Sequence, residues 1–129
     1  MESEPIIVPG AAQQEAGSPR IAADGQSFAV HEWRGSGPPY LHVHHADDEA
    51  WHVLEGTLRF RFADSEVDVP AGTTVFVPAG VPHTYRATDD ARYLIILTPR
   101  LRELIAALQG ARLDQHPEIM RRYQSEVLE

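Results

Sequence analysis

Short apolar segments alternate with turn residues between Phe28 and Leu97, a pattern typical of the strands of a β-sandwich or barrel. Within residues 57–62, Leu58 and Phe60 alternate with Arg59 and Arg61, which predicts one buried and one polar face. Gly56 suits a tight hairpin turn after residue 54, because glycine accepts a positive φ. Eight strands are expected, at 28–33, 40–44, 50–54, 57–62, 66–69, 74–77, 83–87 and 93–97.

The apolar period changes after Leu97 from that of a strand to that of a helix. Thr98 can cap this helix and Pro99 suits its first turn, while Gly110 predicts its end. Four apolar residues repeat at helical spacing: Leu101, Leu104, Ile105 and Leu108. A second short helix is expected from Pro117, and it presents Ile119, Met120, Tyr123 and Val127 to one side.

These patterns divide the chain into three parts within a length of 129 residues, which suits one domain. Residues 1–27 are rich in Ala, Gly, Pro, Gln and Ser and predict an arm, in which only residues 6–8 are strand-like. Residues 28–98 predict an all-β barrel, and residues 99–129 a helical extension.

Composition and charge narrow the class of protein further. The chain has no cysteine, so a metal site must use nitrogen and oxygen ligands. A formal net charge of −8 disfavours nucleic acid as a partner. The longest apolar run, 93–97, is much shorter than the ~20 residues of a membrane-spanning helix. The first residues, Met-Glu-Ser-Glu, lack the basic start of a secretory signal, so we expect a cytoplasmic protein without a membrane partner.

Histidines cluster between positions 42 and 52, and their spacing is informative. His42 and His44 lie two residues apart, so on a strand both side chains point to one face. Residues 46–48 predict a turn that returns Glu49 toward these imidazoles in a hairpin, and the rigid segment 78–82 delivers His83 from a distant strand. Three imidazoles and a carboxylate suit one divalent Fe, Mn, Ni, Co, Cu or Zn ion, and leave coordination positions open for a substrate.

At these residues the sequence resembles the cupin superfamily. Its first motif is Gly, five residues, His-x-His, three or four residues, Glu, six residues, Gly. The positions His42, His44, Glu49 and Gly56 fit it, although Gly37 lies one residue too close. Its second motif is Gly, five residues, Pro-x-Gly, two residues, His, three residues, Asn. The positions Gly72, Pro78, Gly80 and His83 fit, while Ala87 replaces the final Asn.

The resemblance implies a double-stranded β-helix, or jelly roll, with the metal on His42, His44, Glu49 and His83. The terminal helices also resemble those of small single-domain bacterial cupins grouped with quercetin dioxygenases. Such cupins commonly form homodimers, so the resemblance implies the same here.

Other residues are assigned by their phase along the strands. His45 and His52 are out of phase with the predicted ligands and are expected at the surface or an interface. His116 is expected in a surface or cap position, whereas His31 could reach the pocket. Four aromatic residues are the candidates for substrate binding, with core packing as the alternative: Tyr40, Trp51, Phe60 and Tyr85.

The leading functional hypothesis is a metal-dependent enzyme with dioxygenase-type chemistry on a small organic substrate, for which an aromatic or enolic molecule is the narrower expectation. The resemblance implies that Glu49 serves as the base. One alternative is a non-redox isomerase, cyclase or lyase, in which the metal polarises a carbonyl group. Another is a barrel that binds a small molecule without catalysis, since a fold does not dictate a reaction.

Overall fold

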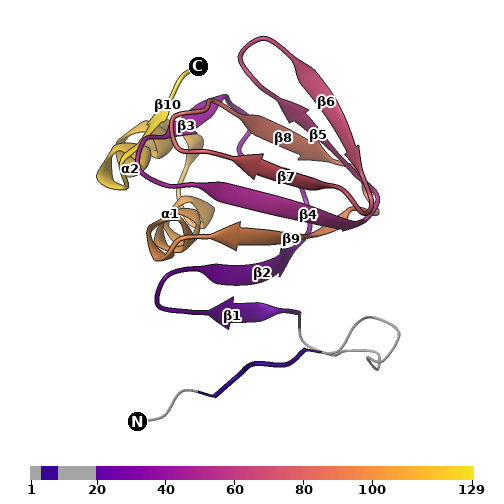
Figure 1. Cartoon of the computed structure of the whole chain (residues 1–129). Coiled ribbons are helices and arrows are strands. Elements are labelled where there is room, and N and C mark those ends of the chain that lie inside the picture. The colour runs from indigo at the N-terminus through magenta and orange to yellow at the C-terminus, as the bar shows by residue number, and fades with distance from the viewer. Residues whose placement is uncertain (1–3, 9–19) are drawn as a thin grey trace.

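The computed structural model describes residues 4–8 and 20–129. Within them, ten antiparallel strands form a five-stranded sheet ordered β1-β2-β9-β4-β7, a three-stranded sheet ordered β6-β5-β8, and the pair β10-β3 (Figure 1). The strands are β1 (Ala22–Asp24), β2 (Ala29–Trp33), β3 (His42–His44), β4 (Glu49–Glu55), β5 (Thr57–Arg61), β6 (Glu66–Pro70), β7 (Thr74–Val77), β8 (Thr84–Ala87), β9 (Arg92–Leu97) and β10 (Ser125–Val127). The helices are α1 (Pro99–Gln109), the 3-10 helix η2 (Leu113–Gln115) and α2 (His116–Arg122). This mostly-β jelly roll with C-terminal helices confirms the predicted fold class.

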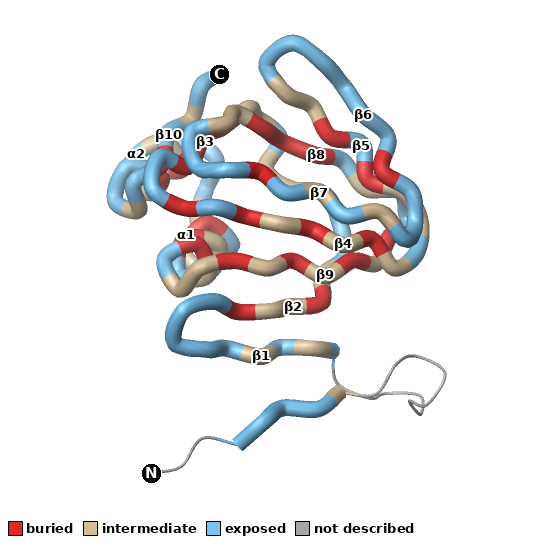
Figure 2. Tube along the Cα trace, viewed as in Figure 1, coloured by how far each residue is buried: buried red, intermediate tan, exposed pale blue. Residues whose placement is uncertain are grey.

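Alternation along the central strands builds one core. On β4, Trp51 and Val53 are buried, and on β9 Tyr93, Ile95 and Leu97 are buried, while the residues between them are half-buried (Figure 2). The prediction for β5 is also confirmed, because Leu58 and Phe60 are fully buried and Arg59 is exposed. The sheets therefore enclose a single apolar interior.

Gly56 lies at a corner between two sheets and not in the predicted hairpin. Strand β4 pairs with β7 and β9, whereas β5 pairs with β6 and β8, so the chain crosses between sheets at residues 55–57. The expectation of a positive φ is confirmed, since Gly56 has a φ of 69°. A Cβ there would lie 2.7 Å from backbone atoms of Ala91, so the corner also needs the missing side chain for space.

The helical extension lies at one end of the barrel (Figure 1). Thr98 caps α1 by accepting a hydrogen bond from the Leu101 amide, and Pro99 occupies the first turn, as predicted. The predicted apolar face is confirmed, because Leu101, Leu104 and Leu108 are buried. None of the helices in residues 4–8 and 20–129 is long and apolar enough to cross a membrane.

Both ends of the described chain add strands that the sequence pattern did not predict. Residues 125–127 form β10, which pairs with β3, so placing Val127 on the second helix was wrong. Residues 22–24 form β1 against β2, although they fall in the predicted arm. The strand-like residues 6–8 form no strand, and the remainder of the arm, 1–3 and 9–19, lies outside the described residues.

Candidate metal centre

His42 and His44 are both buried and project from β3 into the barrel. An isolated antiparallel bridge sets His83 directly opposite His42, through hydrogen bonds from the His42 amide to the His83 carbonyl (3.1 Å) and back (2.9 Å). The two imidazole centroids are therefore only 4.5 Å apart. Main-chain pairing between distant segments, and not the rigidity of residues 78–82 alone, brings His83 to the other two histidines.

Glu49 reaches the histidines through an anchored connection that is not a hairpin. Strands β3 and β4 do not pair with one another; β3 pairs with β10. Between them, the buried Asp47 accepts hydrogen bonds from Thr98 (3.0 Å) and Arg100 (3.2 Å), and Asp48 accepts one from the Ala79 amide (2.9 Å). These aspartates hold the connection so that Glu49 starts β4 facing inward, which agrees with their predicted role as turn residues.

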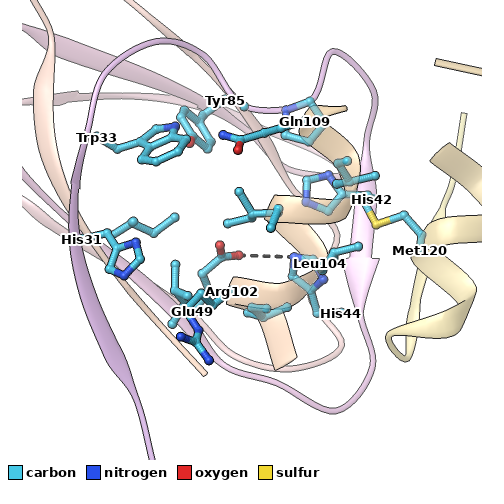
Figure 3. A pocket seen from close by; sticks show the side chains of 18 of the residues that line it. His31, Trp33, His42, His44, Glu49, Tyr85, Arg102, Leu104, Gln109 and Met120 are labelled. Carbon is cyan, nitrogen blue, oxygen red and sulfur yellow. Dashed lines mark ion pairs between the residues drawn. The ribbon is translucent and has the colours of Figure 1, made fainter. Parts of the chain in front are cut away.

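The four predicted ligands converge. His42, His44 and His83 place ring nitrogens within 4.8 Å of one another. The Glu49 Oε1 atom lies 3.2 Å from Nε2 of His83 and 3.3 Å from Nε2 of His44, the contact drawn in Figure 3. All four side chains are at most 6% exposed. This is a buried set of three nitrogens and one oxygen, the chemistry expected for a divalent transition metal.

The hydrogen bonds on the outer side of the rings show that a cation fits this set. Nδ1 of His42 lies 3.3 Å from the Tyr40 carbonyl, and Nδ1 of His83 lies 2.9 Å from the Val81 carbonyl. A carbonyl oxygen only accepts, so each Nδ1 carries a proton and Nε2 is the ring nitrogen that faces the centre. Nε2 of His44 and Nε2 of His83 lie against the Glu49 carboxylate, a contact that needs either a proton on Nε2 or a metal ion in its place.

Burial and mutual repulsion control the charge of these groups. Burial, with the neighbouring His83 and His44, lowers the pKa of His42 to about 3, so its imidazole is neutral at physiological pH. Burial opposes ionisation of Glu49, yet hydrogen bonds from His44 and His83 outweigh it and lower the Glu49 pKa to about 2. The centre thus offers a neutral imidazole and a carboxylate, the forms that bind metal ions.

We expect the metal-free protein to lose stability as the pH falls from about 7 to about 4. The unfolded chain protonates His42 near its ordinary pKa of 6.5, whereas the folded chain resists protonation down to about 3, so acid favours unfolding throughout this window. The stabilisation from the ionised Glu49 is present above the ordinary carboxyl pKa of 4.5 and is lost as the pH falls toward its folded-state pKa of about 2. This loss adds to the destabilisation from His42 at the acid end of the window. Thermal unfolding at several pH values measures this, and His42→Gln should flatten the upper part of the profile. An equal Tm at pH 7 and pH 4 would contradict the expectation.

A cavity of about 400 Å³ adjoins the centre, between the sheet of β2, β4 and β9 and the helices α1 and α2 (Figure 3). His42, His44 and Glu49 belong to its wall, together with two of the four predicted substrate-binding residues, Trp51 and Tyr85. His31 also lines it, as its position on an early strand allowed, and its Nε2 lies 2.6 Å from Oδ1 of Asp24 on β1.

The other two aromatic candidates lie elsewhere. Phe60 is fully buried, stacks on Tyr85 with ring centroids 5.1 Å apart, and is not among the residues described as lining the cavity. Tyr40 is half-buried, and its hydroxyl group lies 2.7 Å from Nδ1 of His116, which does line the cavity. Phe60 is therefore a core residue that packs against Tyr85, and Tyr40 contacts the cavity-lining His116 without lining the cavity itself.

The Tyr85 ring is held by a chain of hydroxyl groups and a close glycine. Tyr93 donates to the Gly35 carbonyl (2.8 Å), so the Tyr85 hydroxyl group, 2.8 Å away, donates to Tyr93. Burial raises the Tyr85 pKa to about 12, which keeps this proton in place. A Cβ at Gly37 would lie 2.6 Å from the Tyr85 ring. The absence of a side chain at Gly37 therefore leaves room for the Tyr85 ring.

Two residues of the C-terminal extension were missed. His116, expected at the surface or in a cap, is buried; it lines the cavity, and its Nε2 has no hydrogen-bond partner among the described residues. Ser125 is buried 2.8 Å from Nδ1 of His44. By contrast, His45 and His52 point away as predicted, toward Glu126 and Thr74. The spacing of His116 and Ser125 carried no periodic signal that would have revealed them.

An antiparallel jelly roll whose interior holds three histidines and a glutamate defines a β-barrel of the cupin type with a site suited to a metal. The cupin domain family model matches residues 30–98, slightly more than half of the chain and a stretch that contains all four side chains. This chain belongs to the cupin domain family.

Three individual proteins are similar to this chain. The Streptomyces coelicolor protein SCO3923, described as uncharacterized, is 34% identical over 56 residues, which are 43% of this chain. The match covers 53% of that relative, about half of its length. A cupin-2 domain protein from Shewanella frigidimarina superposes with a TM-score of 0.51 at 28% identity, over 67% of this chain and 84% of that one. NMB1881 from Neisseria meningitidis superposes with a TM-score of 0.53 at 24% identity, over 68% and 90%, and supports the fold alone.

Proposed function

We propose that this protein is a metal-dependent enzyme acting on a small organic molecule, with dioxygenase-type chemistry as the first candidate. One observation carries the proposal: His42, His44 and Glu49 form part of the wall of a cavity of about 400 Å³. A structural metal site is closed by its ligands, whereas a site that opens into a ligand-sized cavity leaves room for a substrate atom.

The cavity wall favours a substrate with an apolar body and few polar groups. Trp51, Ile95, Leu104 and Met120 contribute apolar surface from the sheet and both helices. Polar groups line the cavity at the metal centre and also elsewhere in its wall, where His31, Arg102, Gln109 and His116 contribute. Nε2 of His116 is buried without a hydrogen-bond partner among the described residues. An aromatic or enolic molecule, with one ionisable oxygen at the centre, matches this distribution.

Under this proposal the side chains of the centre bind the metal ion and transfer a proton. His42, His44, His83 and Glu49 would hold the ion, which would supply a Lewis acid and, where it is redox-active, electrons for dioxygen chemistry. The Glu49 Oε1 atom accepts the proton of a substrate hydroxyl group placed in the cavity. Hydrogen bonds from His44 and His83 lower the Glu49 pKa to about 2, so Glu49 becomes a stronger base when these contacts lengthen. The apolar wall excludes water while the proton moves.

Metal analysis of the protein purified from its native host, followed by oxygen-uptake assays with flavonols and other enolic phenols, tests the proposal. Iron, manganese, nickel, cobalt or copper together with oxygen uptake supports it. Zinc without oxygen uptake would instead support a non-redox isomerase, cyclase or lyase. A protein that binds no transition metal would contradict metal-dependent catalysis and support a small-molecule-binding barrel.

We expect Ile105→Trp to weaken substrate binding without removing the metal. Ile105 is half-buried on α1 and lines the cavity, so an indole ring there occupies volume that the substrate needs. The expected result is a raised KM and unchanged metal content. Glu103→Trp is the matched control, because it adds the same ring to the same helix at an exposed position that the cavity lining does not include. An equal KM in both variants would place the substrate elsewhere.

A further inference from the structure

His44 differs from the other two histidines of the centre in the partner of its outer nitrogen. The Nδ1 atoms of His42 and His83 contact backbone carbonyls, whereas Nδ1 of His44 lies 2.8 Å from the side-chain hydroxyl group of Ser125. Ser125 is only 3% exposed and is paired with His44 in the register of β10 against β3. This contact joins the centre to a strand 81 residues further along the chain.

The direction of this hydrogen bond follows from a second one. Ser125 Oγ also lies 3.1 Å from the carbonyl oxygen of Tyr123, which can only accept. The single hydroxyl proton is therefore donated to Tyr123, and the Ser125 oxygen accepts the proton on Nδ1 of His44. With a proton fixed on Nδ1, Nε2 is the nitrogen of His44 that is available to bind a metal ion at the centre.

We infer that Ser125 is a positioning residue of the metal centre: it fixes the tautomer and the ring orientation of His44. The inference deepens the proposed function, since it concerns the same centre. It also assigns a part of that centre to the C-terminal extension, because Ser125 lies outside residues 30–98, which match the cupin domain. Outer hydrogen-bond partners of this kind are typically worth about 10–100-fold in metal affinity.

The segment around Ser125 is itself held firmly against the barrel. Glu126 and Val127 continue the pairing of β10 with Val43 and His42. Beyond them, the Glu129 carboxylate accepts hydrogen bonds from the Leu41 amide (2.7 Å) and from Arg61 (2.6 and 2.9 Å). Ser125 is therefore the first residue of a strand that is paired along its length and fixed again at Glu129, so its oxygen keeps a fixed position relative to His44.

The test is the affinity of the purified protein, residues 1–129, for Zn²⁺, measured by competition with a chelating indicator. We expect Ser125→Ala to weaken binding about 10–100-fold. Ser125→Thr, which keeps the hydroxyl group on a residue suited to strands, should restore most of the affinity. Glu126→Gln is the matched control on the same strand, since its side chain contacts the exposed His45 and not the centre; its affinity should equal that of the wild type.

A second measurement separates positioning from a general effect on folding. In the metal-free wild-type protein the Nδ1 proton of His44 should give a slowly exchanging NMR signal, which Ser125→Ala removes. Unchanged Zn²⁺ affinity in Ser125→Ala, or an equal loss in Glu126→Gln, overturns the inference. If Ser125→Ala does not fold, the wild type decides, because a His44 without a proton on Nδ1 also overturns it. If Zn²⁺ binding depends on Ser125 but the protein shows no turnover, the proposed function is refuted while the inference about Ser125 stands.

Discussion

Replacing Glu49 with glutamine is expected to leave a metal in the centre and to slow turnover by about 10²–10⁴-fold, the usual contribution of a general base. Glutamine keeps the shape of the side chain but loses the negative charge and the ability to accept a proton. The three imidazoles remain, so binding weakens without being abolished. Assays at saturating metal therefore report the loss of the proton acceptor.

Glu55→Gln provides the matched control for this experiment. Glu55 lies at the other end of the same strand, is exposed, and pairs with Arg92 at 3.1 Å, so the same chemical change there leaves the centre intact. Turnover should be close to that of the wild type. If Glu49→Gln retained wild-type turnover at full metal loading, Glu49 would have no catalytic role and would serve as a ligand only.

Replacing His83 with phenylalanine is expected to abolish both stable metal binding and turnover. The change removes a ligand nitrogen from a set of four, and its effect on affinity should exceed the roughly 100-fold that an outer partner can contribute. Phenylalanine fills most of the space of an imidazole that is 1% exposed and edge-on to Trp51, so the core remains occupied. Metal analysis after dialysis and direct titration measure the result.

His52→Phe is the control for the loss of a histidine as such. His52 lies on β4, and its ring contacts Thr74 in place of the centre, so metal content should not change. Circular dichroism establishes that both variants fold. A folded His83→Phe protein that binds one metal ion as tightly as the wild type would remove His83 from the ligand set.

The sequence predicted those parts of the site that rest on local spacing. His42 and His44 share a face because they are two residues apart on a strand, and the capping Thr98 with the apolar period after it predicted α1 correctly. The position of Glu49 beside the histidines was predicted correctly, but from a hairpin that the structure does not contain. The turn at 46–48 was expected to close a hairpin, but the structure anchors it to Thr98, Arg100 and Ala79.

Features that rest on distant partners were not predictable from local patterns. Strand β10 is three residues long and exists because β3 offers it hydrogen bonds, so no alternation could distinguish it from the end of a helix. The roles of Ser125 and His116 likewise come from contacts with His44 and Tyr40, 81 and 76 residues away. Such contacts become visible only when the topology is known.

The helical cover has a consequence for engineering this barrel. Helices α1 and α2 supply much of the cavity wall, including Leu104, Ile105 and Met120, while the imidazoles come from the sheets. Grafting residues 101–122 from a related barrel, which keeps Thr98 and Arg100 as the anchors of Asp47, would therefore exchange much of the cavity wall and leave the four predicted ligands in place. The graft would have to end before residue 123, because the hydroxyl group of Ser125 contacts His44 and is itself held by the Tyr123 carbonyl.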